Sequence, residues 1–194
     1  RAEAGHKQLG TAWLWFDLLL ASMALVATAR NGLLFLVAWE GMALSSFFLV
    51  VFHHERPGVA RAGWVYLVAT HLGTAFLLVL FAWLARDAGS LDFARWSRPE
   101  SGAIWLFALA LIGFGSKAGF FPFHVWLPEA HPVAPSHVSA LLSGVMIKLG
   151  IYGLLRMVVL LGPPPSSVAL ALVVVALVSG LFGVLLALGQ HDIK

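Results

Sequence analysis

Three ionisable residues lie in the middle of long apolar runs of this sequence: Glu40 in FLVAWEGMALSS, Lys117 in GFGSKAGFF and Lys148 in SGVMIKLGIYG. On insertion scales a charged side chain at the centre of a bilayer costs about 2.5–3.5 kcal/mol, so such residues are rare and usually face the protein interior. Each lies roughly two or more helical turns from either end of its run, too far to reach water easily. An acid and two amines at similar depth predict a proton relay, and a buried ion pair that locks two helices together is the alternative.

Lysine suits a relay because burial and a neighbouring carboxylate act in opposite senses on how tightly an amine holds its proton. We therefore hypothesise that movement of Glu40 or its partners switches Lys117 between holding and releasing a proton. A spectroscopic titration that found Lys117 charged in every working state would count against this hypothesis.

Two histidines are candidates for the same relay. His137 and Lys148 are eleven residues apart, so they share one face if the helix that carries them is regular. His137 then passes protons between Lys148 and the water-facing end, or else it caps the helix locally. His71, in VATHLGT, is a relay member or a residue that hydrogen bonds across helices. The wider series of His124, His131 and His137 lacks the tighter spacing usual for zinc ligands, so we predict no metal site.

Small residues and a proline surround Lys117. Gly115 and Gly119 remove side-chain bulk, and Pro122 removes a backbone donor, so together they predict a kinked or broken helix beside the lysine. Transporters use broken helices at membrane depth to form their ion sites. In the alternative reading, the glycines only allow close helix packing.

The elements that must position these residues are membrane helices. Of 194 residues, 60% are hydrophobic and 11% charged, whereas a soluble domain has about half apolar and a quarter charged residues. A segment that crosses lipid must be helical, since a helix satisfies its own backbone groups. We predict an all-α, polytopic membrane helix bundle that forms a single transmembrane domain. Its six segments run about Thr11–Ala29, Gly32–Phe52, Arg61–Leu84, Ala103–Phe123, Ser136–Leu161 and Ser166–Leu188.

The remaining composition excludes several classes of function. The chain has no cysteine, which excludes disulfides and thiolate-bound metal or redox centres of its own, and we predict no cofactor. No block of like charges suggests a nucleic-acid partner. The proline-rich stretch WLPEAHPVAP is predicted to be a connector. Apart from Lys117 and Lys148, the basic residues leave the orientation open, because five gather on each side: Arg1, Lys7, Arg56, Arg61 and Lys194 against Arg30, Arg86, Arg95, Arg98 and Arg156.

Two long motifs, FLVAWEGMALSSFFLV and GFGSKAGFFPFHVWLPEAHPVAPSHVSALLSGVMIKLGIYGLLR, resemble the antiporter-like membrane subunits of respiratory complex I and the Mrp sodium/proton antiporters. The resemblance runs from about Leu33 to Lys194. The sequence of the second motif is most similar to that of the hydrogenase-linked branch, which includes membrane subunits of hydrogenase 4 and of formate hydrogenlyase. The terminal ALGQHDIK is similar to the start of the family's next signature, so we expect this chain to be a fragment of a longer protein.

The resemblance implies a fold of about fourteen helices around two inverted five-helix repeats. This chain would hold the first repeat, about residues 11–161, and the start of the second, about 166–194. Glu40, Lys117 and Lys148 match the family's glutamate and two lysines, and His137 falls near a position that is often polar in the relay. The family's partner residue on the second broken helix would lie beyond Lys194.

The resemblance also implies a function for the intact subunit. It would move protons, or sodium against protons, as part of a redox-driven complex of the NADH–quinone oxidoreductase or membrane hydrogenase type. Its partners would be the lipid bilayer, other membrane subunits and a soluble redox arm, in the inner membrane of a prokaryote. Any oxidoreductase activity would belong to the complex. An Mrp-type antiporter without redox coupling and a structural membrane anchor are the alternatives.

Overall fold

The computed structural model describes residues 2–97 and 102–189, with side chains from residue 9 onward. This described part holds helices and loops but no strand, apart from one isolated bridge between Asn31 and Asp92. Its elements are, in chain order, α1 (Ala2–Thr28), α2 (Gly32–Val50), α3 (Val59–Ala88), the 3-10 turn η1 (Phe93–Arg95), α4 (Ala103–Ala118), the 3-10 turn η2 (Phe123–Val125), α5 (Trp126–Val133), α6 (Ser136–Leu141), the π turn η3 (Leu142–Met146), α7 (Ile147–Leu161) and α8 (Ser166–Leu188).

Six helices in the described residues are long and apolar enough to cross a membrane, which confirms the predicted all-α bundle. Five of the six spans lie close to the predicted segments. The fourth, Ala103–Val133, is longer, because the chain is helical again in α5 after the break. The prediction of a connector at WLPEAHPVAP was therefore wrong. Pro128 lies in the first turn of α5, where a missing N–H costs little.

Helix α2, which carries Glu40, has a well-defined start. Asn31 is its N-cap, with an extended backbone and a side-chain oxygen that accepts from the N–H groups of Leu33 and Leu34 at 2.9 and 3.3 Å. A helix start leaves four N–H groups without a partner, and this cap satisfies two of them. The cap fixes where α2 begins and so the position of Glu40 along it.

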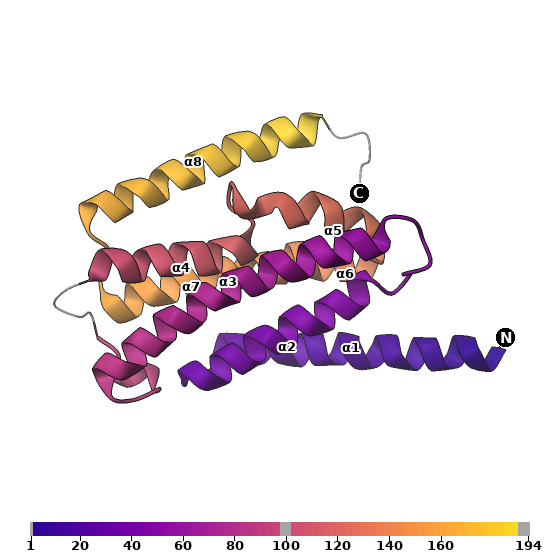
Figure 1. The fold of residues 1–194 in the computed structure, drawn as a ribbon, viewed down its shortest axis with the longest axis horizontal. Helices are drawn as coiled ribbons and strands as arrows, with labels where there is room; N and C mark the ends of the chain where they lie inside the picture. The colour runs from indigo at the N-terminus through magenta and orange to yellow at the C-terminus, as the bar shows by residue number, and fades with distance from the viewer. Residues whose placement is uncertain (1, 98–101, 190–194) are drawn as a thin grey trace.

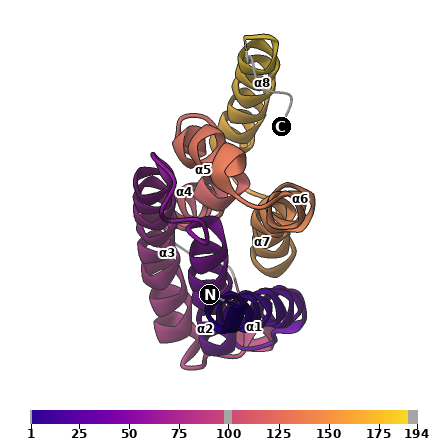
Figure 2. The same ribbon diagram turned by 90° about the vertical axis from the view of Figure 1, so that its right-hand side faces the viewer.

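Helix α4, which carries Lys117, lies at the centre of the bundle. Helices α3 and α7 pack against it, while α2 packs between α1 and α3 (Figures 1 and 2). Edge-to-face and tilted aromatic contacts fill the interior between these helices, among them those of Phe35, Trp39, Phe81 and Phe114. Helix α8 lies at the edge of the bundle against α4, and only 6% of its span is buried.

Helix α7 approaches the last turns of α4 very closely. A Cβ atom at Gly150 would lie 2.7 Å from both the carbonyl oxygen of Phe114 and the backbone nitrogen of Ala118. Only glycine allows two helices to meet at this separation without a shift of backbone. The contact holds the helix end that carries Lys117 against the helix that carries Lys148.

The predicted helix break beside Lys117 is confirmed. Helix α4 ends at Ala118, and Gly119 follows in the left-handed region with φ of +72°. The N–H of Phe120 then bonds the carbonyl of Gly115 at 3.0 Å, the closing bond of a Schellman motif. The indole of Trp126, from the start of α5, donates to the carbonyl of Ser116 at 2.8 Å. These bonds satisfy carbonyls that a buried helix end would otherwise leave unpaired.

The segment that carries His137 and Lys148 is not the regular helix that their spacing assumed. Between α6 and α7 the chain makes a π turn over Leu142–Met146. A π turn adds a residue to the local helical repeat, so an interval of eleven residues no longer equals three α-helical turns. No residue type in LSGVM marks this change of repeat, which explains why the sequence did not predict it.

Candidate functional site

Lys117 is fully enclosed by the protein. Its residue is 1% exposed, and it lies in the last turn of α4, where the negative end of the helix dipole favours a cation. Its Nζ lies 5.8 Å from the ring centroid of Trp39 and 5.5 Å from that of Tyr66. It donates a long hydrogen bond of 3.4 Å to the Tyr66 hydroxyl. The amine thus sits in an aromatic box with one polar contact in the described residues.

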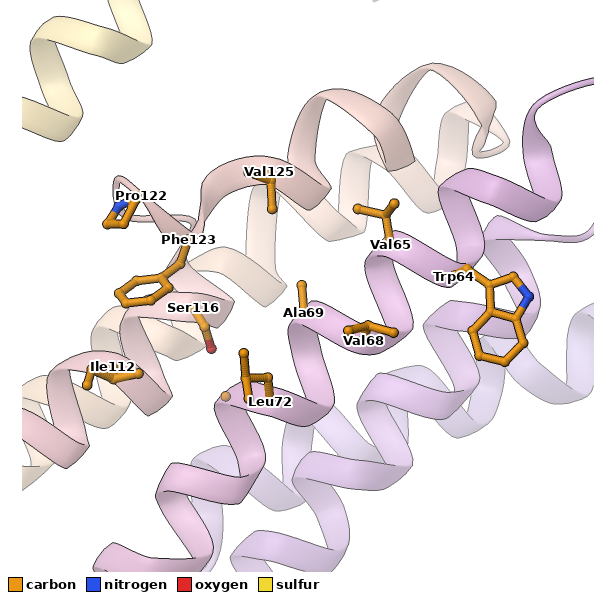
Figure 3. Close-up of a pocket in the computed structure, with 11 residues that line it drawn as sticks. Trp64, Val65, Val68, Ala69, Leu72, Ile112, Ser116, Pro122, Phe123 and Val125 are labelled. Carbon is orange, nitrogen blue, oxygen red and sulfur yellow. The ribbon is translucent and has the colours of Figure 1, made fainter.

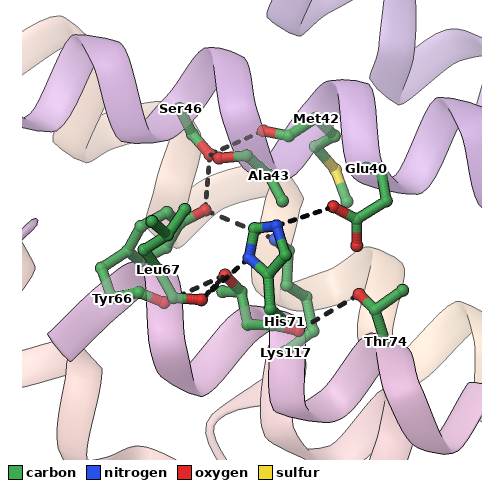
Figure 4. Close-up of polar contacts among 10 residues, drawn as sticks. Glu40, Met42, Ala43, Ser46, Tyr66, Leu67, His71, Thr74 and Lys117 are labelled. Carbon is green, nitrogen blue, oxygen red and sulfur yellow. Dashed lines mark hydrogen bonds and ion pairs between the residues drawn. The ribbon is translucent and has the colours of Figure 1, made fainter. Parts of the chain in front are cut away.

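Glu40 pairs with His71 across the contact between α2 and α3. Oε2 of Glu40 lies 3.1 Å from Nε2 of His71, and Figure 4 shows the pair beside Lys117. Nδ1 of His71 lies 2.9 Å from the carbonyl oxygen of Leu67, which can only accept, so we assign a hydrogen to Nδ1. The contact between Nε2 and Oε2 then needs one further proton, which either group can carry. The geometry of Glu40 and His71 is therefore that of a hydrogen-bonded pair with one proton between Nε2 and Oε2.

The second carboxylate oxygen of Glu40, Oε1, takes no part in the pair with His71. Oε1 is buried and has no hydrogen-bond partner among the described residues. The described part of the chain shows no direct ion pair between Glu40 and Lys117, but both side chains belong to the same polar cluster (Figure 4). A buried carboxylate oxygen without a partner is costly, so this atom is a natural place to accept a proton or a bridging water.

Of the five relay residues predicted from the sequence, the structure brings together Glu40, His71 and Lys117. Lys148 and His137 lie exposed on the surface of this chain. Nζ of Lys148 donates to the carbonyl of Ser143 at 3.1 Å, a group of the π turn. The ring of His137 makes an edge contact with Phe16 at 5.6 Å between centroids. The part that these two residues take in a relay stays a prediction.

The sequence reading missed two residues of the cluster. The hydroxyl of Tyr66 lies 2.5 Å from that of Ser46, and both residues are fully buried. A signal was present, because Tyr66, Thr70 and Thr74 recur every four residues and therefore share a face of α3 with one another. Ser46 was harder to find, since a serine in a helix often bonds only to its own backbone.

Two cavities lie at the helix break after α4. The first, of about 460 Å³, is an almost wholly apolar groove between α3, α4 and the chain after the break, and Ser116 is among its lining residues (Figure 3). The second, of about 820 Å³, lies between α5, the π turn and α8, and its polar residues include His124, His131, Ser143 and Ser179. Ser143, whose carbonyl accepts a hydrogen bond from Lys148, lines this second cavity. No group of three or more histidine, aspartate or glutamate side chains in the described residues could hold a metal ion.

Comparison with known proteins places this arrangement in a family. A family model described as NADH:quinone oxidoreductase/Mrp antiporter, TM, matches residues 29–194. The chain belongs to this family. The match covers both the glutamate motif and the broken-helix motif, so the resemblance stated from the sequence is confirmed. With six apolar helices, this member of the NADH:quinone oxidoreductase/Mrp antiporter family is an integral membrane protein.

Individual relatives of this family member are named as subunits or components of redox complexes. The chain is 41% identical over 186 residues to Hydrogenase-4 component B of Escherichia coli K12, and this alignment covers 93% of the chain and 28% of that relative. It is 33% identical over 195 residues to Formate hydrogenlyase subunit 3 of the same organism, covering 97% and 30%. It is 30% identical over 173 residues to NADH-ubiquinone oxidoreductase chain 4 of Metridium senile, covering 87% and 35%. The chain thus spans about a third or less of each relative's length.

Proposed function

We propose that this chain is the relay-bearing part of a proton-translocating membrane subunit in a redox-driven complex of the membrane hydrogenase or NADH–quinone oxidoreductase type. The observation that carries the proposal is the placement of Lys117. It is 1% exposed, it lies in the last turn of one half of a broken membrane helix, and it lies in the same polar cluster as a carboxylate paired with a histidine (Figure 4). Structural ion pairs do not need a shared proton or a helix break.

The Glu40–His71 pair provides a physical switch for Lys117. With its shared proton the pair is neutral overall, and without it the pair carries one negative charge. At an effective dielectric constant of about 20, a unit charge change roughly 4–8 Å away is worth on the order of 2–4 kcal/mol. Loss of the shared proton therefore favours a proton on Lys117, and its return favours release from Lys117. A water on Oε1 of Glu40 would complete the connection between them.

From Lys117 we propose that the path continues to Lys148 and His137. Lys148 lies on α7, which packs directly on the end of α4. The polar groups of the larger cavity lie beside Ser143, the residue that holds Lys148 by its carbonyl. In this reading residues 11–161 form the first repeat of the subunit, and residues from 166 onward begin the second. Of the latter, Gln190 to Lys194 lie outside the described residues.

The exposed side of the Glu40–His71 pair supports a protein partner. The side chain of His71 is 43% exposed and that of Glu40 29%, near the middle of α3 and α2. A polar pair facing lipid at this depth would be costly, whereas another membrane subunit can cover it with polar groups. We propose that this chain assembles with other membrane subunits and a soluble redox arm in the inner membrane of a prokaryote. The relatives named above favour this assignment over an Mrp-type antiporter.

The proposal is tested in inverted membrane vesicles that contain the complete complex. Acidification of the lumen is followed with a pH-sensitive dye after addition of NADH, formate or hydrogen, and separately after an imposed sodium gradient. We expect acidification with an electron donor, reduced more than tenfold by Glu40→Gln and by Lys117→Met. Arg86→Met is the matched control, because it removes an exposed charge at the end of α3 away from the cluster.

The outcomes separate the three functions. Proton movement that follows only the sodium gradient would favour an antiporter without redox coupling. Loss of complex assembly, measured on native gels, with normal proton movement per assembled complex would favour a structural anchor. Normal acidification by a fully assembled Lys117→Met complex would refute the relay.

A further inference from the structure

Tyr66 lies where four elements of the bundle meet, and its side chain is fully buried. Its hydroxyl contacts Ser46 of α2 and Lys117 of α4, and it lies 3.6 Å from the sulfur of Met146 in the π turn. Its ring packs edge-on against Trp126 of α5, with centroids 5.2 Å apart. Tyr66 thus contacts the amine and also α2, both sides of the helix break and the π turn.

The orientation of the Tyr66 hydroxyl is set by Ser46. The Ser46 hydroxyl lies 2.6 Å from the carbonyl oxygen of Met42, which can only accept, so its single hydrogen points there. Its oxygen then accepts from Tyr66 at 2.5 Å. The sulfur of Met146 is a weaker acceptor and does not compete with this bond. The lone pairs of the Tyr66 oxygen are therefore left facing Nζ of Lys117.

We propose that Tyr66, oriented by Ser46, is a positioning residue for Lys117: its oxygen accepts from Nζ and its ring, with that of Trp39, encloses the amine. This inference rests on the proposed function only for its effect on proton transport. The geometry itself, a hydroxyl directed at a buried amine, stands independently.

Tyr66 positions the proton of Lys117 and does not carry it onward. A proton passed from Nζ to the Tyr66 oxygen would have to displace the phenolic hydrogen to Ser46, and the Ser46 hydrogen to the carbonyl of Met42. A backbone carbonyl does not hold a proton under working conditions, so this chain of three bonds is a dead end. The proton that leaves Nζ therefore does not leave through Tyr66, and Nζ keeps its bond to the Tyr66 oxygen.

The structure offers closely matched variants. Tyr66→Phe removes the hydroxyl and keeps the ring, and Ser46→Ala removes the group that orients it. Ser45→Ala is the control for Ser46→Ala, because Ser45 is equally buried and, among the described residues, bonds only to carbonyls of its own helix. Thr70→Val is the control for Tyr66→Phe, because Thr70 is a buried hydroxyl one turn along α3 that, within the described part of the chain, also bonds only to its own helix.

The direct readout is the infrared band of the Lys117 amine in the assembled complex, with ¹⁵N-labelled lysine and assigned by its absence in Lys117→Met. We expect this band to shift in Tyr66→Phe and Ser46→Ala and to stay in place in Ser45→Ala and Thr70→Val. Proton transport per electron should fall about tenfold in Tyr66→Phe, the scale of a lost hydrogen bond to a charged group.

An unshifted band in assembled Tyr66→Phe would overturn the inference, and so would equal shifts in the two controls. Failure of the proposed function gives a different pattern. The Lys117→Met complex would then transport protons normally, while the Lys117 band of complexes that keep the lysine would still shift in Tyr66→Phe. A shifted band with unchanged transport in Tyr66→Phe would show that the contact does not serve the relay, which also overturns the inference.

Discussion

At the scale of single residues, the Glu40–His71 pair is the part of the cluster that can change charge most simply. His71 holds its ring by donating Nδ1–H to Leu67, which leaves Nε2 to share a proton with the carboxylate. In the proposed relay, the shared proton leaves and returns while the Nδ1–H bond holds the ring, so the pair alternates between neutral and negative. This alternation is what the proposed relay requires of the group next to Lys117.

His71→Gln keeps a side chain that can donate to Glu40 but cannot bind or release a proton. We expect proton transport in membrane vesicles to fall at least tenfold, with the complex assembled, since the charge of the pair can no longer alternate. His54→Gln is the control, because His54 forms an exposed pair with Glu55 at 3.7 Å in the loop after α2. Equal transport by His71→Gln and the unsubstituted complex would exclude His71 from the relay.

The sequence predicted the charged members of the cluster and missed its hydroxyls. Glu40, His71 and Lys117 stand out because an ionisable side chain in an apolar run has few explanations. Ser46 and Tyr66 do not stand out, since a helix accepts serine through a bond to its own backbone and tyrosine through its largely apolar ring. Their contact depends on how α2 and α3 pack, which one sequence does not specify.

At the scale of elements, the break after α4 places Lys117 at a helix end inside the bundle. Glycine and proline positions predicted this break because they remove bulk and a backbone donor. They did not predict that the chain becomes helical again in α5, because prolines in a short stretch also mark connectors. The π turn left no sign in its residue types, although its carbonyl at Ser143 now holds Lys148.

Gly119→Ala tests the geometry of the break. Gly119 has φ of +72°, and an added Cβ would also meet the side chain of Leu127. We expect a loss of stability of about 1–2 kcal/mol, seen as a lower midpoint of thermal unfolding of the complex in detergent. Gly180→Ala in the interior of α8 should not lower the midpoint, since its Cβ would meet nothing within 4 Å and alanine favours a helix. Equal midpoints for Gly119→Ala and the unsubstituted complex would contradict the described break.

At the scale of the whole molecule, the two cavities differ in what they can contain. The larger one carries histidine and serine side chains beside α8, whereas the groove along α3 is almost wholly apolar. Polar side chains favour water and an apolar groove open at membrane depth favours acyl chains. We therefore expect water in the larger cavity, on the Lys148 side of the broken helix, and lipid or protein in the apolar groove on the other side.

Because the chain has no cysteine, single cysteines can report where water lies. In a complex whose other cysteines are replaced, Ser143→Cys should react with a charged maleimide, since only a thiol in contact with water ionises readily. Val68→Cys, at a residue of the apolar groove that is 60% exposed, should react at least tenfold more slowly. Comparable rates for the two positions would mean that the larger cavity is not a water-filled path.

The proposed relay depends at every scale on Lys117 gaining and losing a proton. The most direct test is an infrared difference spectrum of the ¹⁵N-lysine-labelled complex between rest and steady turnover, with the Lys117→Met complex as reference. The relay predicts a band of the lysine ammonium that changes in amplitude on turnover and is missing from the Lys117→Met spectrum. A Lys117 ammonium band of the same amplitude at rest and during proton transport would contradict it.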